Sequence, residues 1–474
     1  MPAGIATSDP RATAAGAELL AAGASAVDAA VAAALVLYVV EPQSCGLGGD
    51  AFMMHVAPGS DPVGRDGSGA LPRALDDEAL AAAGLDTIPA RGAAAATVPG
   101  AIRLLEDALA EFGSRSFADV AQPAIALARD GFEVRPTLAA AAAKAAAEIA
   151  DDPVLGPLFV PGGEPVATGD TVVNPSLAEC LTAICRDGSR LLHEGDLGRA
   201  VVARLRAAGG FLGVDDFGEH KTLPMGPVSV TFRDSTVWEL PPPTQGVAVT
   251  YALEAIAAEF PAVESADDWR CVVDVMAEAM VRAGFDLSQI GARPSPAKGD
   301  TTYIAAIDRE GRGASLITSL FGDFGAHFGI PELGGAIGNR ATMLRALRRP
   351  MMPGRKPPHT TIPAAVTRDG RLQMVLGVAG GFMQPQAQVQ VLVHMVERGL
   401  APQAAIDEPR FRIGFGGVLS LEAGHPLCDS MPDAAARPPG PEGFGAAQVV
   451  AVDAEGSVRA GADPRRGGAA TALP

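Results

Sequence analysis

The chain has 474 residues, of which 48% are hydrophobic and 19% charged, a balance typical of a globular protein with a large core. Its 55 acidic residues outnumber its 37 lysines and arginines, which gives a formal net charge of -18. Such a charge repels phosphate backbones and anionic lipid surfaces, so nucleic acids and membranes are excluded as expected partners.

The sequence also lacks the patterns that indicate secretion, a membrane span, a disulfide framework or a metal site. Its N-terminus has no basic stretch followed by an apolar one, and the longest apolar run, residues 29–40, is shorter than the roughly 20 residues that a bilayer requires. The five cysteines form no CxxC pair and the seven histidines form no HExxH motif. We therefore expect a soluble cytoplasmic protein that uses neither a metal nor a cofactor.

The first half of the chain is predicted to be rich in helices. Two helices are expected before Pro42, separated near Gly23. The segment SCGLGGD follows, and because it has neither GxGxxG spacing after a strand nor a GK[ST] sequence, it predicts a tight turn between closely approaching backbones. A strand is expected at DAFMMHVAP, and further helices are expected at AIRLLEDALAEFG, VAQPAIALARDGFEV and residues 138–150.

Beyond Val228 the pattern changes to strands and turns. VSVTFRDSTVWEL predicts two strands, followed by a rigid corner of three prolines. One helical stretch, residues 251–284, precedes GARPSPAKGD, which has the composition of an exposed, flexible loop. Thr301 is then expected to begin a strand, and TTYIAAIDREGRGASLITSLFG predicts a hairpin.

A threonine where a loop meets a strand has either an ordinary strand role or a chemical one. Its hydroxyl is a poor nucleophile unless a base lies within hydrogen-bond reach. Cleavage of the preceding bond would make Thr301 an N-terminus, whose α-amino group has a pKa of roughly 7.7 to 8.0 and is a suitable base. In the uncut chain the hydroxyl would attack the carbonyl of Asp300, and the acyl group would move from nitrogen to oxygen. Water would then hydrolyse the ester.

Sequence blocks spread over most of the chain resemble the γ-glutamyltranspeptidase family of N-terminal nucleophile hydrolases. The likeness runs from about residue 5 to about residue 413. The blocks occur in the family's order: AGASAVDAAVAAALVLYVVEPQSCGLGGDAFM, ATVPGA, PAIALARDGFEV, LPPPTQG, TTYIAAIDREG, PGRKPPHTTIPAAV, GVAGG and AIDEPRFR. GGFMQPQ, residues 380–386, is more similar to the oxamate amidohydrolase and cephalosporin acylase branch than to ordinary transpeptidases.

The resemblance implies a fold and a division of the chain. The implied fold is an α/β sandwich of four layers, αββα, with two antiparallel sheets between helical layers. One precursor would yield a large subunit, residues 1–300, and a small subunit, residues 301–474, which form one interleaved domain because their strands share a core. The expected partners are a small-molecule substrate and the chain's own cleaved subunits as a heterodimer, with a dimer of heterodimers as a further option.

The family pattern also implies catalytic roles. It makes the bond between Asp300 and Thr301 the cleavage site and Thr301 the nucleophile. Ser319 falls where the family has a second hydroxyl that hydrogen-bonds the nucleophile; an ordinary strand serine is the alternative. The N–H groups of Gly380 and Gly381 would form the oxyanion hole, where a side chain would block the oxyanion; a plain turn is the alternative.

Residues that bind the acyl group differ from the family pattern at several positions. Ser68 takes the place of the arginine that binds the α-carboxylate in ordinary γ-glutamyltranspeptidases, and the nearby Arg65 is out of register. His359 and Thr360 replace the paired serines of the acyl pocket. These residues are the expected substrate-binding group, together with an arginine from the block after the second hydroxyl.

That arginine is Arg340. Arg340 and Met343 stand where a glutamine and an aspartate would bind the substrate's α-amino group, and Phe321 replaces an asparagine. Compared with the family pattern, this block therefore lacks the acid that would bind an ammonium group and has a permanent cation instead. Arg340 is expected to bind a carboxylate bidentately. A solvated or structural arginine is the alternative reading.

The resulting hypothesis is a self-processing amide hydrolase, an amidohydrolase or acyltransferase whose acyl group carries a carboxylate but not the γ-glutamyl zwitterion. Three alternatives remain open from the sequence. The first is hydrolysis of a carbon–carbon bond that removes an oxalyl-like fragment in secondary metabolism. The second is an ordinary γ-glutamyl hydrolase or transferase, and the third is a non-catalytic binding homologue.

Overall fold

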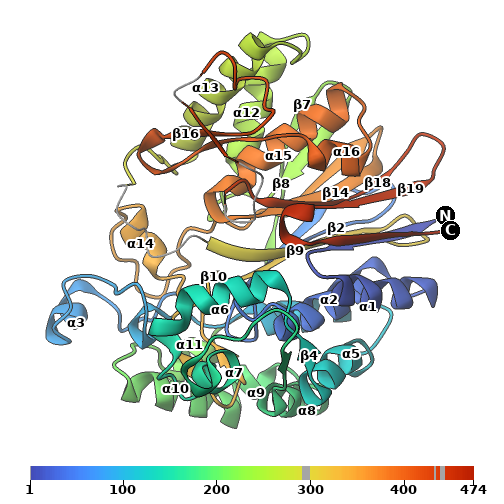
Figure 1. The fold of residues 1–474 in the computed structure, drawn as a ribbon. Helices are drawn as coiled ribbons and strands as arrows, with labels where there is room; N and C mark the ends of the chain where they lie inside the picture. Colours follow the sequence, from blue (N-terminus) through green and yellow to red (C-terminus); the bar gives the residue numbers. More distant parts are fainter. Residues whose placement is uncertain (1, 291–298, 432–433, 438–442) are drawn as a thin grey trace.

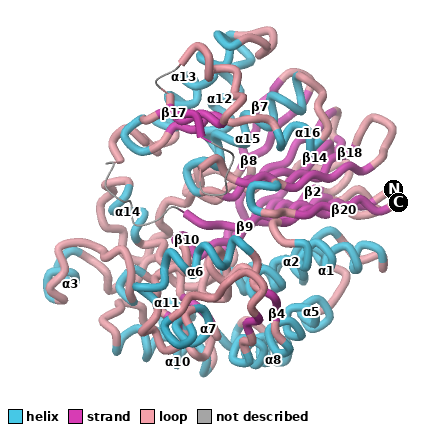
Figure 2. The backbone as a smooth tube through the Cα atoms, in the orientation of Figure 1, coloured by secondary structure: helices cyan, strands magenta, loops and turns pink. Residues whose placement is uncertain are grey.

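Two large sheets packed face to face form the centre of the molecule, and helices cover the outer face of each sheet (Figures 1 and 2). The computed structural model describes residues 2–290, 299–431, 434–437 and 443–474. Neighbouring strands in both sheets run antiparallel. The expected four-layer αββα sandwich is therefore confirmed.

The first sheet has seven strands with the order β20-β1-β9-β10-β2-β3-β6. Their bounds, in that order, are Ala469–Leu473, Ala3–Thr7, Gly299–Ile307, Gly313–Gly322, Asp50–Val56, Val63–Asp66 and Leu223–Met225. The predicted hairpin is confirmed as β9 and β10, at the centre of the sheet. The expectation that Thr301 begins the strand is wrong, because Gly299 and Asp300 already pair with the end of β10.

The second sheet has six strands with the order β19-β18-β14-β13-β8-β7. Their bounds are Val458–Ala462, Ala446–Val452, Arg371–Ala379, Ala364–Arg368, Ser235–Glu239 and Val228–Phe232. β14 and β18 pack against β9 of the first sheet. Apolar side chains of both sheets fill the space between them, among them Phe52, Tyr303, Ile317, Val375 and Val450.

A thick helical layer covers the outer face of the first sheet (Figure 1). Its longer helices are α1 (Pro10–Ala21), α2 (Ala26–Val40), α4 (Ala101–Phe112), α5 (Phe117–Asp130), α6 (Pro136–Ile149), α8 (Pro175–Asp187) and α10 (Asp196–Ala207). Every residue of α2 is buried, because α2 lies between β9 and β10 on one side and α1 and α5 on the other. The buried position of α2 explains the long apolar run at residues 29–40. Among the described residues, no helix has the length and apolar character needed to cross a bilayer.

A second helical layer covers the other sheet and contains α12 (Gly246–Glu259), α13 (Ala266–Arg282), α15 (Gln384–Leu392) and α16 (Pro402–Asp407). The single helix expected over residues 251–284 is therefore wrong. Pro261 interrupts it, and Ser265 caps a new helix by accepting a hydrogen bond from the backbone N–H of Asp268. The predicted flexible loop lies, up to residue 298, outside the described residues.

Shorter elements complete the chain. They are α3 (Asp77–Ala82), α7 (Leu155–Phe159), α9 (Arg190–His193), α11 (Val214–Gly218), α14 (Thr342–Ala346), β4 (Phe132–Glu133), β5 (Thr171–Val172), β11 (Gly329–Ile330), β12 (Gly335–Ala336), β15 (Phe411–Ile413), β16 (Leu419–Glu422) and β17 (Ala435–Arg437). Two single turns matter for the site: η3 (Gly381–Met383) and η6 (Pro464–Arg466).

Each of the two large sheets contains strands from both parts of the chain, before and after residue 300. In the first sheet β9 lies between β1 and β10, and β10 in turn pairs with β2. In the second sheet β13 pairs with β8. A division after residue 300 would therefore leave neither piece with a complete sheet.

Candidate active site

Three polar side chains occupy neighbouring positions at one end of the first sheet. Ser319 of β10 lies opposite Asp50 of β2, and the hydroxyl of Thr301 on β9 donates to Ser319 Oγ at 3.3 Å. All three residues are buried. Because side chains alternate along a strand, they share a face with the residues two positions further along each strand, which belong to the core between the sheets: Phe52, Tyr303 and Ile317. The candidate nucleophile thus faces the space between the two sheets.

A β-bulge places Ser319 beside Thr301. The pairing of β9 with β10 shifts by one residue between Thr318 and Phe321, and Phe321 has a φ of 77°. The backbone N–H of Phe321 donates to Ser319 Oγ at 2.8 Å. Bulges beside functional sites commonly redirect a side chain in this way. The serine oxygen therefore accepts bonds from both sides and fixes the position of the Thr301 hydroxyl.

The SCGLGGD segment forms the predicted tight turn beneath this bulge. A Cβ atom added to Gly49 would lie 2.5 Å from the carbonyl oxygen of Ser319, and one added to Gly48 would lie 2.3 Å from that of Ala336. Real side chains do not tolerate such distances, so these positions require glycine. The glycines of this turn allow the backbone to support Ser319 rather than to bind phosphate.

Replacing Ser319 by alanine is expected to lower kcat about tenfold, the effect of losing one hydrogen bond that orients the nucleophile. Steady-state assays and a time course of chain cleavage would measure the effect. Ser315→Ala is the matched control, because Ser315 lies buried on the same strand but hydrogen-bonds the hydroxyl of Tyr303 at 2.6 Å. Equal effects of the two variants would contradict the role of Ser319.

The backbone of Thr301 is held by Arg466 of η6. Nη1 of Arg466 donates to the carbonyl oxygen of Thr301 at 2.8 Å. On the opposite face of β9, the Thr302 hydroxyl hydrogen-bonds Ser8 Oγ at 2.6 Å, and Ser8 donates to Glu41 Oε2 at 2.8 Å. Burial raises the pKa of Glu41, while the charge of Arg466 acts in the opposite direction. This part of β9 is therefore anchored through the backbone of Thr301 and through the side chain of Thr302.

Replacing Arg466 by methionine is expected to lower kcat tenfold or more, with a smaller change in KM. A strand that begins at Thr301 would fray without the bond to its first carbonyl, and a hydrogen bond to a charged group contributes about 1.5–3 kcal/mol. Steady-state kinetics would separate kcat from KM. Arg459→Met is the control, because Arg459 lies on the surface and pairs with Asp453.

The candidate oxyanion hole lies at the end of β14, where η3 packs against β9. Gly380 has a φ of 136° and Gly381 a φ of 59°, conformations that favour glycine. Nε2 of Gln245 donates to the carbonyl oxygens of Gly381 and Thr360, at 2.9 and 2.6 Å. This side chain therefore fixes the glycine turn relative to the acyl-pocket segment.

Arg340 is fully enclosed, with 1% of its surface exposed. Its Nε donates to Asp50 Oδ2 at 3.2 Å, its Nη1 approaches Thr360 Oγ1 at 3.5 Å, and its guanidinium stacks on Phe321 with 4.4 Å to the ring centroid. Its Nη2 has no hydrogen-bond partner within the described ranges. An arginine remains charged even when buried, and an unsatisfied donor of this kind is costly. Both alternatives from the sequence thus apply in part: Arg340 has a structural partner and also a donor that a ligand can use.

His359 and Thr360 lie beside Arg340 and are both buried. The His359 ring packs edge-on against Phe52 at 5.0 Å, and neither ring nitrogen has a hydrogen-bond partner in the part of the chain that the structure describes. Burial lowers the pKa of His359 well below its usual value, and the charges of Arg340 and Lys356 lower it further. The imidazole is therefore neutral at pH 7 and offers one N–H donor and one acceptor.

Ser68 is linked to Arg340 only indirectly, through the residue that follows it in the chain. Its N–H and hydroxyl donate to Asp66 Oδ1 at 2.7 and 2.6 Å. The next residue, Gly69, donates its N–H to Asp50 Oδ1 at 2.8 Å. Ser68 therefore shapes the loop that supports Asp50. Arg65 pairs with Glu111 instead.

Three residues important to this geometry were not identified from the sequence: Asp50, Gln245 and Arg466. Asp50 had a signal, since a buried acid directly after a glycine turn and before an apolar strand needs a cation. Gln245 belongs to LPPPTQG, but nothing in that block indicates which carbonyls it binds. Arg466 lies beyond residue 413, where the recognised blocks end.

The family model described as gamma-glutamyltranspeptidase matches residues 12–291 and 285–473, so the likeness continues past residue 413. The oxamate amidohydrolase proenzyme of Klebsiella pneumoniae is 31% identical over 437 residues, which cover 83% of this chain and 81% of that protein. The acylase ACY 1 proenzyme of Pseudomonas sp. (strain SE83) is 30% identical over 484 residues, which cover 91% and 85%.

A solved structure of an acylase also matches nearly the whole chain. The crystal structure of cephalosporin acylase from Bacillus halodurans matches with a TM-score of 0.90 at 29% identity, covering 99% of this chain and 95% of that one. The chain therefore belongs to the γ-glutamyltranspeptidase family, in its acylase-like branch, and is an enzyme of the N-terminal nucleophile amidohydrolase type.

Proposed function

We propose that the chain cuts itself between Asp300 and Thr301, and that Thr301 then hydrolyses an amide whose acyl group carries a carboxylate but no α-amino group. The products of cleavage, residues 1–300 and 301–474, form a heterodimer. The relatives named as proenzymes support the cleavage, and the relatives named as an acylase and an oxamate amidohydrolase support the class of reaction.

The observation that carries the substrate assignment is the environment of Arg340. Arg340 is a buried cation that pairs with Asp50, the residue opposite Ser319 on the neighbouring strand, and its Nη2 is unsatisfied among the described residues. Carboxylates satisfy such a donor with a charge-assisted bond. The charge of Asp50 is already paired with Arg340, which donates to its Oδ2, while Gly69 N–H donates to its Oδ1.

The catalytic steps follow from the positions of these groups. The Thr301 hydroxyl attacks the amide carbonyl, and the α-amino group released by self-cleavage accepts its proton. The N–H groups of Gly380 and Gly381 stabilise the oxyanion, and Ser319 orients the hydroxyl. The α-amino group then protonates the leaving amine, and water hydrolyses the ester on Thr301.

Steady-state kinetics with matched amides tests the substrate class. Oxamic and glutaryl amides are expected to have a higher kcat/KM than γ-glutamyl-p-nitroanilide. A preference for the γ-glutamyl substrate would overturn the assignment and restore the ordinary γ-glutamyl function. Release of oxalate from a keto acid, without any amide turnover, would instead indicate carbon–carbon bond hydrolysis.

A further inference from the structure

Two buried glutamines of α15 bind the backbone of residues 359–362, which we call the acyl-pocket segment. Oε1 of Gln384 accepts a hydrogen bond from the N–H of Ile362 at 3.1 Å. Nε2 of Gln388 donates to the carbonyl oxygen of the same residue at 2.9 Å. Side chains of one helix therefore bind both hydrogen-bonding groups of the Ile362 backbone.

The acyl-pocket segment is also tied to η3, the turn that contains the candidate oxyanion donor Gly381. A single nitrogen atom, Nε2 of Gln245, donates to the carbonyl oxygens of both Thr360 and Gly381. Gln384 directly follows η3 in the chain, so its bond to the segment is a second tie. Thr360 Oγ1 in turn lies 3.5 Å from Nη1 of Arg340. These contacts fix the spacing between the candidate oxyanion hole and Arg340.

The two faces of α15 bind different neighbours. Gln384 and Gln388 are four residues apart and share one face of the helix. Gln386 and Gln390 share the opposite face and bind β15. Each of them accepts a hydrogen bond from the N–H of one β15 residue and donates to the carbonyl oxygen of that residue, at distances of 2.7–3.1 Å.

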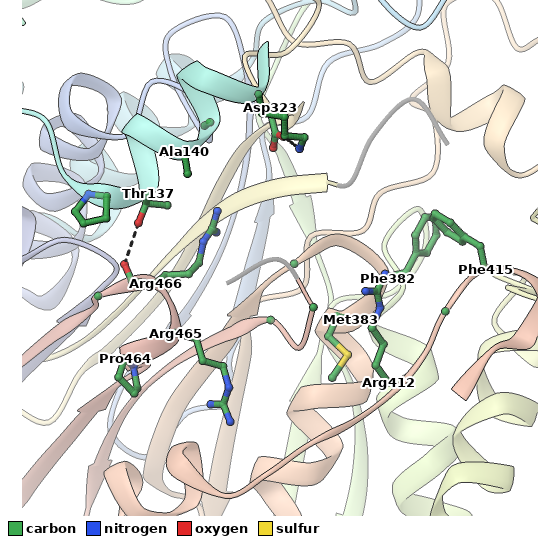
Figure 3. Close-up of a pocket in the computed structure, with 18 of the residues that line it drawn as sticks. Thr137, Ala140, Asp323, Phe382, Met383, Arg412, Phe415, Pro464, Arg465 and Arg466 are labelled. Atoms are coloured by element: carbon green, nitrogen blue, oxygen red, sulfur yellow. Dashed lines mark hydrogen bonds and ion pairs between the residues drawn. The ribbon is translucent and has the colours of Figure 1, made fainter. Parts of the chain in front are cut away.

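β15 belongs to a region separate from the acyl-pocket segment. Arg412 of β15 lines a cavity of about 490 Å³, and Figure 3 shows it on the same side of this cavity as Phe382 and Phe415. Arg340 and the acyl-pocket segment are not among the residues that line the cavity. The glutamines on the β15 face of α15 are therefore a natural comparison for those on the other face.

Gln384 and Gln388 are not explained by filling space. Among the described residues, Nε2 of Gln384 and Oε1 of Gln388 are buried without a hydrogen-bond partner. An apolar side chain of similar size would be buried at lower cost. What the amide groups supply is their bonds to Ile362.

We infer that Gln245, Gln384 and Gln388 are positioning residues that set the distance between the oxyanion hole and Arg340, and thereby the length of the acyl group that the enzyme accepts. The inference rests on the proposed function, in which Arg340 binds the carboxylate of the acyl group. The carbonyl carbon of such a group reaches Thr301 only when the number of methylenes between the two ends matches this distance. One methylene in a fitted pocket changes selectivity about tenfold or more.

Binding of free dicarboxylates measures this distance without any chemical step. Calorimetry on the purified protein gives the dissociation constants of oxalate, malonate, succinate, glutarate and adipate. One length is expected to bind about tenfold more tightly than the lengths one methylene shorter and longer. In Gln388→Met this ratio is expected to fall about fivefold, because the carbonyl of Ile362 loses its partner and the segment shifts, while methionine fills the space of the glutamine. Gln384→Met removes the other bond to Ile362 and is expected to act in the same direction.

Gln390→Met is the matched control. It removes the side-chain partner of both backbone groups of Phe411, so it is expected to lower the thermal unfolding temperature at least as much as Gln388→Met. Its dependence of binding on dicarboxylate length is expected to equal that of the wild type. A wild-type protein that binds neighbouring lengths equally, or an equal loss of length preference in Gln390→Met, would overturn the inference.

Kinetics separates this inference from the proposed function. The malonyl, succinyl, glutaryl and adipyl p-nitroanilides give a second length profile through their kcat/KM values. Amide turnover with the same length profile in the wild type and in Gln388→Met would overturn the positioning role alone. Absence of amide turnover, with a binding profile that flattens in Gln388→Met but not in Gln390→Met, would overturn the proposed function while supporting the positioning role.

Discussion

Thr301→Ala is expected to remain a single uncut chain under conditions in which the wild-type protein yields residues 1–300 and 301–474. The reason is chemical: alanine has no hydroxyl to attack the carbonyl of Asp300, so the N-to-O acyl shift cannot begin. The core is not expected to change, because the substitution removes two atoms from a strand end whose Oγ1 bonds Ser319 at 3.3 Å. Intact mass spectrometry under denaturing conditions gives the answer directly.

Thr301→Ser is the matched control for this experiment. Serine keeps the hydroxyl and loses only a methyl group, so cleavage is expected to continue at the same bond. N-terminal sequencing of the smaller fragment would identify its first residue. A wild-type chain that stays uncut after long incubation would contradict the proposal, and the binding homologue would then become the better account of this protein.

Removal of the Arg340 charge is expected to produce the second large effect, a loss of selectivity for acyl groups that carry a carboxylate. The measured quantity is the kcat/KM of glutaryl-p-nitroanilide divided by that of butyryl-p-nitroanilide, which has no carboxylate. This ratio is expected to fall about 10- to 100-fold, since a charge-assisted hydrogen bond contributes roughly 1.5–3 kcal/mol. An unchanged ratio would return Arg340 to a structural role.

The choice of variant matters because Arg340 is the partner of a buried acid. Arg340→Met alone would leave Asp50 unpaired, which costs about 3–5 kcal/mol when a buried ion pair is broken. The double variant Asp50→Asn/Arg340→Met removes both charges and is the suitable test. Asp50→Asn alone is its control, because it retains the Arg340 cation and an amide oxygen that can accept the bond from Nε. Since this variant also breaks the charge pair, thermal unfolding of both variants would show that each remains folded.

Much of the architecture could be predicted from residue patterns and from resemblance. Helix and strand boundaries followed capping residues, prolines and alternation, as in α2 and the β9–β10 hairpin. The position of Pro261 could have divided the helix at residues 251–284, but the helical pattern on both sides concealed the break. The start of β9 could not be predicted, because the pairing of Gly299 and Asp300 depends on the partner strand, β10.

The arrangement of the candidate site required the three-dimensional structure. Sequence spacing cannot show that Asp50 and Arg340, which are 290 positions apart, form one ion pair. Nor can it show that Arg466, near the end of the chain, reaches the carbonyl of Thr301. The roles of Thr301, Ser319, Gly380, Gly381 and the acyl-pocket residues stay predictions until the variants are measured.

The contribution of both parts of the chain to each sheet has a consequence for recovery from denaturation. Before cleavage, β1, β9 and β10 belong to one chain, and refolding is a first-order process that does not depend on concentration. After the proposed cleavage, the β9–β10 hairpin must insert between β1 and β2 of a separate polypeptide, so refolding becomes second-order and competes with aggregation of exposed strand edges. The cut protein would then be stable mainly because it unfolds slowly, and an unfolded molecule would seldom be recovered.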